Sequence, residues 1–566
     1  MKRILTTCFI ATCLFANAQT TTTNTTEYVF VYFKDKPNKA SFYSNPLSEL
    51  TQKALDRRAN LGIALDDRDA PLETTYLDDV KTSLGLTKIK DKSKWLNGVA
   101  VTINTTQKDL LLAKPYVLKI ESFAKNNAIL AKTKQEKNNK FPEEFLVDET
   151  QSKNQKITVT YNYGSSSTQT DISNIKPLHV ANYTGKGIAI AILDSGFPKA
   201  NTLNAFATIR NSGRIKDIYN FISDNTDVYN TALNSHGTNV FGIIGAYLNT
   251  SSYKYVGAAP DADFYLYATE DAYGNNGNDY PAEEMNFIQG LERADKMGVD
   301  IATASLGYQA FGDSRYNYTY ADMNGTKSFV ARGANIAVEK GIMVLNASGN
   351  NGASTTYKYI NTPSDSDKVI SIGAVDKNKV VSTFTSYGPN ALGQIRPDGA
   401  AQGTAVYYPN QSGTISYGNG TSYATPIAAG GLACILQGIS KKTPRSVIKN
   451  ALIQKASLYP SYDKNNRIGY GIINFNNAFT LLKTNYAAKA TPKNEISDII
   501  ISSNIVKDQL TISTKSKNVT TEVFDMNGRK VISGNKVINT ANLPKGIYIL
   551  NVTTETGTKT EKIIKE

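Results

Sequence analysis

The amino-acid sequence predicts an α/β protein with a mostly parallel sheet in its largest domain, a small α+β domain before it and a small β-sandwich after it. Two patterns lead to this prediction. From about residue 157 to 485, apolar strand-like runs alternate with longer helical patterns, as in a parallel sheet with helices on both faces. After residue 495 the strands are short and are broken by turn signals, which is typical of an antiparallel module.

The first residues predict a cleavable signal peptide over residues 1–18. A basic pair and an apolar run over residues 2–15 precede Ala16-Asn17-Ala18, the order of segments found in secretory signals. Cys13 leaves a lipoprotein signal open as an alternative. We therefore expect an exported protein, and its mature form keeps one cysteine, Cys434, so it forms no internal disulfide.

Residues 19–131 predict a small α+β domain. Helical stretches lie near residues 47–60 and 107–113, and strand-like runs cover Tyr28–Phe33, Gly98–Ile103 and Val117–Ile120. The stretch 132–156 is polar and charged and has little apolar surface to bury, so we expect a linker there. The central domain spans residues 157–485, with its clearest strands at Gly187–Leu193, Val299–Ser305, Gly341–Ala347 and Val369–Val375. Residues 495–566 form the predicted sandwich.

The composition and charge indicate which kinds of partner the protein binds, and they do not indicate its function. The net charge is +13, with 40% hydrophobic and 20% charged residues, and the length suits about three globular domains. The lysines are scattered among acids and amides, which favours a solvated surface over a nucleic-acid-binding patch. No apolar run after the signal is long enough to cross a membrane.

Three polar residues stand at places where catalytic groups are built. Asp194 ends a buried strand in "GKGIAIAILDSGF", and ligand sites of open α/β sheets lie at the carboxyl ends of strands. His236, one of two histidines in the chain, opens an apolar stretch in "SHGTNVFG". Ser422 follows a glycine-rich turn in "YGNGTSYATPIAAGG", and we expect a helix to begin near Pro426, just after its hydroxyl. Taken singly, each segment also fits a turn or a helix cap.

Taken together, "AILDSGF", "SHGTNVFG" and "GTSYATPIAAG" resemble the signature segments of the subtilisin-like serine proteases. The resemblance implies a subtilisin-like three-layer fold and a secreted serine endopeptidase. His236 would take the proton of Ser422, and Asp194 would orient the imidazole. Asn350, in "VLNASGNNG", would bind the oxyanion together with the backbone N–H of Ser422. His179 lacks such a context, and we expect it to be structural.

The same resemblance implies a substrate pocket between two short segments. Its walls would be formed by Ser305, Leu306 and Gly307 on one side and by Ala347, Ser348 and Gly349 on the other. No cofactor or metal ligand is required for this chemistry. Family members often bind calcium, and the loop Asp271–Asp279 offers acids and amides, but it lacks a fixed ligand spacing and a solvated loop is favoured. Tyr423 stands where better-known members carry methionine.

The flanking domains acquire roles by resemblance as well. "WLNGVAVTI" and "YVLKIES" are similar to the inhibitory propeptide of the family, which implies a zymogen with the propeptide as intramolecular inhibitor. "FDMNGRKV" and "LPKGIYIL" resemble the C-terminal sorting domain of type IX secretion cargo in Bacteroidetes. We therefore expect a monomer, secreted or held at the cell surface after passing the periplasm, with polypeptide substrates and the secretion machinery as partners. The alternative is a catalytically silent binding or adhesion protein on the same scaffold.

Overall fold

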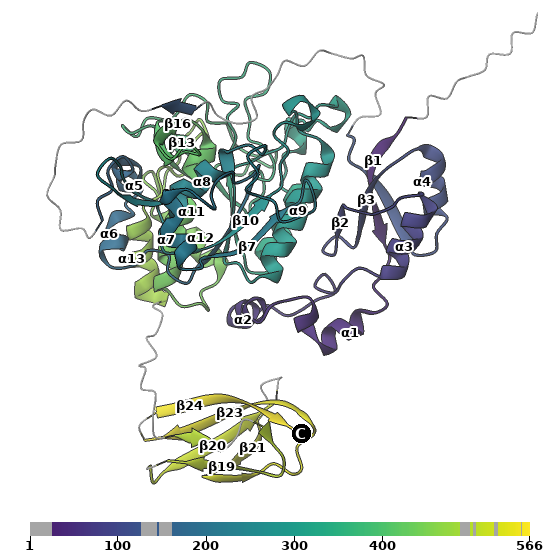
Figure 1. The fold of residues 1–566 in the computed structure, drawn as a ribbon, viewed down its shortest axis with the longest axis vertical. Coiled ribbons are helices and arrows are strands. Elements are labelled where there is room, and N and C mark those ends of the chain that lie inside the picture. Colours follow the sequence, from purple (N-terminus) through teal and green to yellow (C-terminus); the bar gives the residue numbers. More distant parts are fainter. Residues whose placement is uncertain are drawn as a thin grey trace, which may run out of the picture. The chain divides into compact units, whose positions relative to one another are not determined.

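The computed structural model describes residues 25–125, 144–146, 161–486, 499–501, 505–514, 516–525, 530–555 and 557–566 (Figure 1). The chain forms two compact units, residues 1–487 and 488–566. The predicted signal peptide and most of the predicted linker lie outside the described residues. Among the described helices, none has the length and apolar character needed to cross a membrane.

A seven-stranded sheet is the centre of the first unit. Its strands, in spatial order, are β14 (Gly399–Gln402), β13 (Ile370–Val375), β12 (Met343–Ala347), β11 (Ile301–Ala304), β6 (Ala189–Asp194), β10 (Asp263–Ala268) and β7 (Ile215–Asn220). Every neighbouring pair is parallel. The predicted mostly parallel sheet is therefore confirmed.

Helices cover both faces of this sheet, which gives the predicted three layers (Figure 1). Ile190 and Ile192 of β6 pack into one apolar core with α8 (His236–Gly245) and α11 (Thr421–Gly438). The alternate residues Ala191 and Leu193 pack into a second core with α9 (Pro281–Lys296) and α10 (Phe329–Glu339). Because successive side chains of a strand point to opposite faces, a strand covered on both sides is apolar throughout.

Shorter elements surround these layers. The remaining helices are α5 (Ser167–Ile172), α6 (Lys176–Val180), α7 (Ala207–Asn211), α12 (Arg445–Gln454) and α13 (Phe475–Tyr486). Two small antiparallel sheets are formed by β8 (Tyr247–Asn249) with β9 (Lys254–Val256), and by β15 (Val406–Pro409), β16 (Ile415–Gly418) and β5 (Glu144–Leu146). The strand β5 lies inside the stretch predicted as linker. The sequence shows no sign of it, because its backbone pairs with β16 and not with a neighbour in sequence.

Helix α11 begins at Thr421, five residues before the start near Pro426 that the sequence suggested. Ser422 therefore lies in the first turn of the helix rather than ahead of it. The sequence misleads because proline is usual in a first helical turn, whereas Pro426 lies inside this helix.

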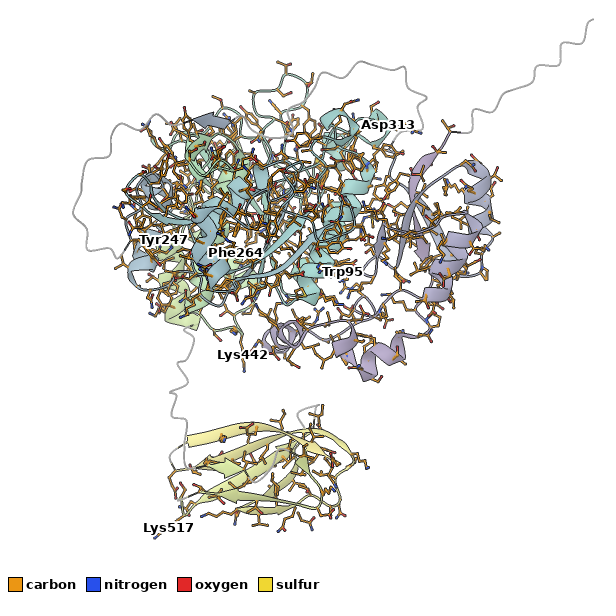
Figure 2. All side chains as sticks on the ribbon, viewed as in Figure 1. Trp95, Tyr247, Phe264, Asp313, Lys442 and Lys517 are labelled. Atoms are coloured by element: carbon orange, nitrogen blue, oxygen red, sulfur yellow. The ribbon has the colours of Figure 1, made fainter. Side chains whose placement is uncertain are left out.

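The N-terminal domain has a four-stranded antiparallel sheet in the order β2 (Lys92–Ser93), β3 (Gly98–Ile103), β1 (Glu27–Phe33) and β4 (Val117–Ser122). Its helices are α1 (Lys39–Ser44), α2 (Gln52–Leu61), α3 (Thr74–Ser83) and α4 (Thr105–Leu112). Val29 and Val31 of β1 pack in the core of the domain itself, whereas Phe30 packs against the large domain. Trp95, labelled in Figure 2, lies in the same interface core.

Helix α2 carries a second, ionic contact with the large domain. Arg57 and Arg58 both bind the carboxylate of Asp295 on α9, with 2.7 Å between Arg58 Nη2 and Asp295 Oδ2. Arg58 also binds Asp69 at 2.6 Å, and Lys340 donates to Asp69 at 2.9 Å. All five side chains are buried. Such ion pairs are costly to break, because removing one partner leaves the other charge buried and uncompensated.

The second unit is a β-sandwich of two sheets, as predicted. One sheet is formed by β17 (Ile500–Ile501), β19 (Gln509–Ser513) and β22 (Val537–Asn539), and the other by β18 (Ile505–Val506), β24 (Gly557–Lys565), β23 (Gly546–Thr554), β20 (Val519–Phe524) and β21 (Lys530–Gly534). Leu510 and Ile538 of the first sheet share one apolar core with Val523 and Leu550 of the second. This shared core makes the two sheets one module.

His179 is a structural residue, as expected. It is buried on α6, where its Nδ1 lies 2.8 Å from the hydroxyl of Tyr163 and its Nε2 lies 3.0 Å from the carbonyl of Ala258. A neutral ring satisfies both contacts, with Nε2–H donating and Nδ1 accepting. Burial lowers the pKa of His179 to about 4.

We predict that His179 makes folding less stable at acidic pH. The unfolded chain takes up the proton near pH 6.5 and the folded chain near pH 4, so stability falls as the pH drops through this window. Between pH 7 and 5 the loss from this residue should be about 2 kcal/mol. Urea unfolding followed by circular dichroism at both pH values should show this extra loss in the natural chain but not in His179→Gln. An equal loss in both would contradict the prediction.

We also predict that Asp295→Ala weakens the attachment of the N-terminal domain, because it leaves Arg57 and Arg58 without their shared carboxylate. The expected loss of stability is about 3–5 kcal/mol, measured by urea unfolding of the unprocessed chain with Trp95 emission as the probe. Asp78→Ala is the matched control, because it removes an exposed pair with Lys81 that contributes about 0.5 kcal/mol or less. Equal effects of the two substitutions would argue against the buried network.

Candidate active site

The sheet register brings the ends of three neighbouring strands to one level. Ala304 of β11 pairs with Leu193 of β6 and with Asn346 of β12. The residues that follow, Ser305 and Asp194, therefore lie side by side at the carboxyl edge of the sheet. Because β6 lies between β10 and β11, which follow it in the chain, this edge is also where the strand order reverses. Ligand sites of open α/β sheets form at such a switch point.

Asp194 and His236 meet at this edge. Asp194 Oδ1 lies 2.8 Å from His236 Nδ1, and Oδ2 lies 3.1 Å from the same nitrogen. Oδ1 also accepts a 2.8 Å hydrogen bond from the backbone N–H of Ser195. Both the carboxylate and the ring are buried. This arrangement assigns the proton on Nδ1 to the hydrogen bond with Asp194 and turns Nε2 away from it.

The start of helix α8 explains how His236 reaches Asp194. Its backbone N–H donates to Asn234 Oδ1 at 2.9 Å, which anchors the first turn. The next residue is Gly237, where a Cβ atom would lie 2.3 Å from the carbonyl of Gly196 and 3.0 Å from Asp194 Cβ. Only glycine therefore allows the helix to approach the end of β6 this closely.

Ser422 lies in the first turn of α11, next to the end of β11. Its hydroxyl donates to the carbonyl of Ser305 at 3.2 Å. In return the hydroxyl of Ser305 donates to the carbonyl of Ser422 at 2.7 Å. The two serines, 117 residues apart in sequence, thus form a reciprocal pair of hydrogen bonds between a strand end and a helix start.

Asn350 lies across the cleft from this pair, in the turn after β12. Its Oδ1 accepts hydrogen bonds from the backbone N–H and from the hydroxyl of Thr421, both at 2.9 Å. Because the oxygen is held in this way, the orientation of the side-chain amide is set by the residue directly before Ser422. The NH₂ group is left as the donor that this amide can offer to a ligand.

These residues open into a cleft of about 500 Å³. Among the residues singled out in the sequence, it is lined by Ser305, Leu306, Gly307, Ala347, Gly349, Asn350 and Ser422. Ser348 is fully buried and does not line it. The remaining lining is largely polar, with Glu270 and Asp279 as its charged members. A peptide segment could lie in this cleft beside the hydroxyl of Ser422.

Two aromatic contacts at the site were not evident from the sequence. The ring of Tyr423 packs against the imidazole of His236 with 5.6 Å between centroids, and against Tyr408 with 5.0 Å. The departure from methionine at position 423 thus places an aromatic ring beside the histidine. Its position after Ser422 was visible in the sequence, but its neighbours come from α8 and β15, which are distant along the chain.

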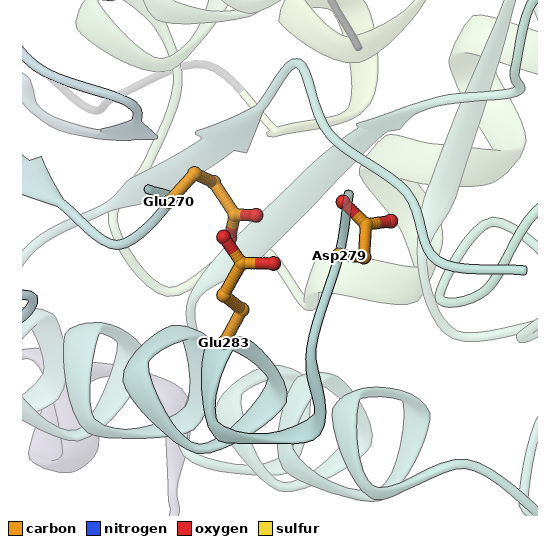
Figure 3. A group of neighbouring side chains, drawn as sticks. All are labelled: Glu270, Asp279 and Glu283. Atoms are coloured by element: carbon orange, nitrogen blue, oxygen red, sulfur yellow. The ribbon is translucent and has the colours of Figure 1, made fainter. Parts of the chain in front are cut away.

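Three carboxylates gather close together (Figure 3), and two of them, Glu270 and Asp279, line the cleft. Glu270 follows β10, Glu283 lies in the first turn of α9, and Asp279 comes from the loop between them; each offers an oxygen within 4.8 Å of the others. Tyr308 donates its hydroxyl to Glu270, and burial raises the pKa of this tyrosine well above its usual value.

Carboxylate oxygens are the ligands that calcium prefers, and the ion takes six to eight of them. The cluster therefore fits part of a calcium shell, and backbone carbonyls or water would have to complete it. Of the loop Asp271–Asp279, only Asp279 belongs to this cluster. Asp271 instead accepts a 2.7 Å hydrogen bond from the backbone of Gly274.

Comparison with protein families identifies each part of the chain. Residues 185–471 match the subtilase family, residues 28–143 match the peptidase S8 propeptide domain of Bacteroidota, and residues 504–566 match a secretion-system C-terminal sorting domain. These matches confirm the predicted family and the kinds of flanking domain. The sorting domain also confirms the expected export, to the medium or the cell surface.

Curated relatives agree with these matches. Subtilisin DY of Bacillus licheniformis is 31% identical over 45% of this chain and 78% of its own length. The serine protease AprX of Bacillus subtilis is 30% identical over 52% of this chain and 66% of its own length. The solved structure of a cold-adapted subtilisin-like serine proteinase shares 22% identity over 52% of this chain and 90% of that one, with a TM-score of 0.39.

The match to the subtilase model covers half of the chain, and the propeptide and sorting domains on either side are those of an exported protease made as a precursor. The chain therefore belongs to the subtilase family and is a serine endopeptidase.

Proposed function

We propose that the protein hydrolyses peptide bonds with Ser422 as nucleophile, His236 as general base and Asp194 as the group that orients and stabilises the imidazole. The observation that carries this proposal is the buried contact of 2.8 Å between Asp194 and His236, at the same strand edge as the cleft that holds Ser422. A carboxylate on Nδ1 selects the tautomer whose Nε2 accepts a proton.

The proposed reaction needs a peptide carbonyl in the cleft beside Ser422. Oγ attacks the carbonyl carbon while its proton passes to His236 Nε2. For this step the hydroxyl leaves the carbonyl of Ser305 and turns toward the ring. The resulting oxyanion accepts hydrogen bonds from the Ser422 backbone N–H and the Asn350 amide. His236 then protonates the leaving amine, and water releases the acyl group by the same steps in reverse order.

The substrate-binding residues inferred from the family resemblance fit this geometry. Ser305, Leu306 and Gly307 extend β11 along the cleft, so a substrate strand can pair with their backbone. Ala347 and Gly349 form the facing wall. All proton transfers take place between side chains, the substrate and the attacking water, so the proposed chemistry requires no cofactor. A calcium ion at the acidic cluster would act on stability.

We further propose that the N-terminal domain inhibits the enzyme until it is cut off, and that the mature enzyme is monomeric. The inhibitory role is supported by the extensive apolar and ionic contact of that domain with α9 and α10. A silent binding protein on the same scaffold is disfavoured, because Asp194, His236, Asn350 and Ser422 are all retained.

We predict that Ser422→Ala abolishes both hydrolysis and self-processing while leaving the fold intact. The attacking oxygen is lost, so kcat should fall by about 10⁶-fold, the magnitude known for loss of the nucleophile in subtilisin. Processing is visible by fluorescence, because Trp95 is the sole tryptophan and lies in the propeptide. Indole emission should disappear from the purified natural enzyme and persist in Ser422→Ala.

Ser371→Ala is the control for the loss of a buried serine. Its hydroxyl has no hydrogen-bond partner within the described residues, so activity and processing should be retained. Full hydrolysis by Ser422→Ala would refute Ser422 as the nucleophile. Absence of a fluorophosphonate adduct on Ser422 in the processed natural enzyme would favour the binding protein over the protease.

We predict that the acidic limb of the kcat/KM profile follows the titration of His236, since only the neutral ring can accept the proton of Ser422. The mature chain holds just two histidines, and His179 titrates near 4 because burial lowers its pKa. The imidazole NMR signal that remains in His179→Gln should therefore follow the acidic limb of the rate profile. Near-normal hydrolysis by His236→Ala would overturn the assignment.

A further inference from the structure

Helix α11 lacks the backbone hydrogen bond that the carbonyl of Ser422 would normally accept. In an α-helix the carbonyl of each residue accepts from the N–H four residues later. For the carbonyl of Ser422 that donor would be residue 426, which is a proline inside the helix. Proline has no N–H. The carbonyl of the proposed nucleophile is therefore denied its helical partner by the sequence of its own helix.

Ser305 supplies the missing donor. Its hydroxyl donates to the carbonyl of Ser422 at 2.7 Å. Both residues are buried, at 4% and 6% exposed area, so a carbonyl without this bond would lose its partner where water is scarce. A buried carbonyl left without a hydrogen bond is strongly unfavourable, and the backbone would move to find another donor.

We propose that Ser305 is a positioning residue for the nucleophile, which acts through the carbonyl that Pro426 leaves open. This inference rests on the proposed role of Ser422. The bond fixes the orientation of the backbone at Ser422, and with it the Cα–Cβ bond that aims Oγ and the N–H that faces the oxyanion. Because displacements of about 1 Å can reduce catalysis about 100-fold, holding this one carbonyl controls the rate.

The second hydrogen bond of the pair, from the hydroxyl of Ser422 to the carbonyl of Ser305, also contributes to this role. Ser422 Oγ donates to the carbonyl of Ser305 at 3.2 Å, a long and therefore weak hydrogen bond. The short bond holds the backbone of the nucleophile, while the long bond holds the hydroxyl loosely enough for it to turn toward His236. The strand end at Ser305 thus keeps the backbone of Ser422 in place and leaves its side chain able to move.

This role differs from that of a residue which only lines the pocket. A residue that only pairs with the substrate should raise KM when it is changed, and its effect should not depend on position 426. A positioning residue should lower kcat with KM nearly unchanged. Its effect should also be relieved by any change that gives the carbonyl of Ser422 another donor.

The test compares Ser305→Ala, Ser305→Thr, Pro426→Ala and the double variant Ser305→Ala/Pro426→Ala in mature enzyme processed in trans if necessary. Ser305→Ala should lower kcat about 10- to 100-fold, with KM changed less than about threefold, and should slow fluorophosphonate labelling of Ser422 to the same extent. Ser305→Thr keeps the hydroxyl and should retain most of kcat. Pro426→Ala restores an N–H at the helical position, so the double variant should regain at least about fivefold over Ser305→Ala.

Two controls separate folding from positioning. Ser371→Ala removes a buried hydroxyl from the same sheet and should leave kcat unchanged. Thermal unfolding of every variant identifies any that is merely unstable. Ser305→Thr changes neither the helix nor the proline, so the kcat that it retains tests the role of the hydroxyl by itself. A rise in KM without loss of kcat, or no recovery in either Ser305→Thr or the double variant, would overturn the inference.

The outcomes also distinguish this inference from the proposed function. Normal hydrolysis by Ser422→Ala would refute the nucleophile assignment and the positioning role with it. Loss of hydrolysis in Ser422→Ala with normal kcat in Ser305→Ala would refute the positioning role alone. Loss in both, together with recovery in the double variant, would support both.

Discussion

The parallel hydrogen bonding of β6, β11 and β12 is the constraint on which the site depends. The register of these strands places the end of β6 at Asp194 beside Ser305, and β12 ends at the facing wall of the cleft. A shift of one residue in any of these strands would turn its side chains to the opposite face. The apolar cores on both faces prevent such a shift. Packing far from the site thus determines which polar groups meet at the sheet edge.

Each polar group of the proposed site is held by another polar group nearby. Asp194 is held by the N–H of Ser195, and its carboxylate in turn holds His236. Asn350 is held by Thr421, and the carbonyl of Ser422 by Ser305. In a buried site these contacts are stronger than they would be in water, and leaving one unmade is correspondingly unfavourable. Among these contacts the longest is the 3.2 Å hydrogen bond that the hydroxyl of Ser422 donates to the carbonyl of Ser305.

The N-terminal domain contacts the large domain through both apolar and ionic groups. Its strand β1 is apolar on both faces, because one face covers its own helices and the other covers α9 and α10. Phe123 stacks on Phe329 with 3.9 Å between ring centroids. Arg57 and Arg58 both form ion pairs with the carboxylate of Asp295. Separation would expose apolar rings and uncompensated charges at once. These contacts are the physical reason to expect that the N-terminal domain binds the large domain tightly.

The sequence alone determined the order of the domains, the parallel sheet and the four polar residues of the proposed site, because apolar periodicity and short motifs are local properties of the chain. Only the tertiary structure decided that α11 begins at Thr421, that Tyr423 packs on His236, and that Ser305 holds the carbonyl of Ser422. The ionic contact between Arg57 and Asp295 joins residues 238 positions apart. Such pairs leave no periodic signal, since they depend on strand register and on how separate helices pack. The sequence therefore identified the groups proposed to react, and the packing of distant segments decided how each of them is held.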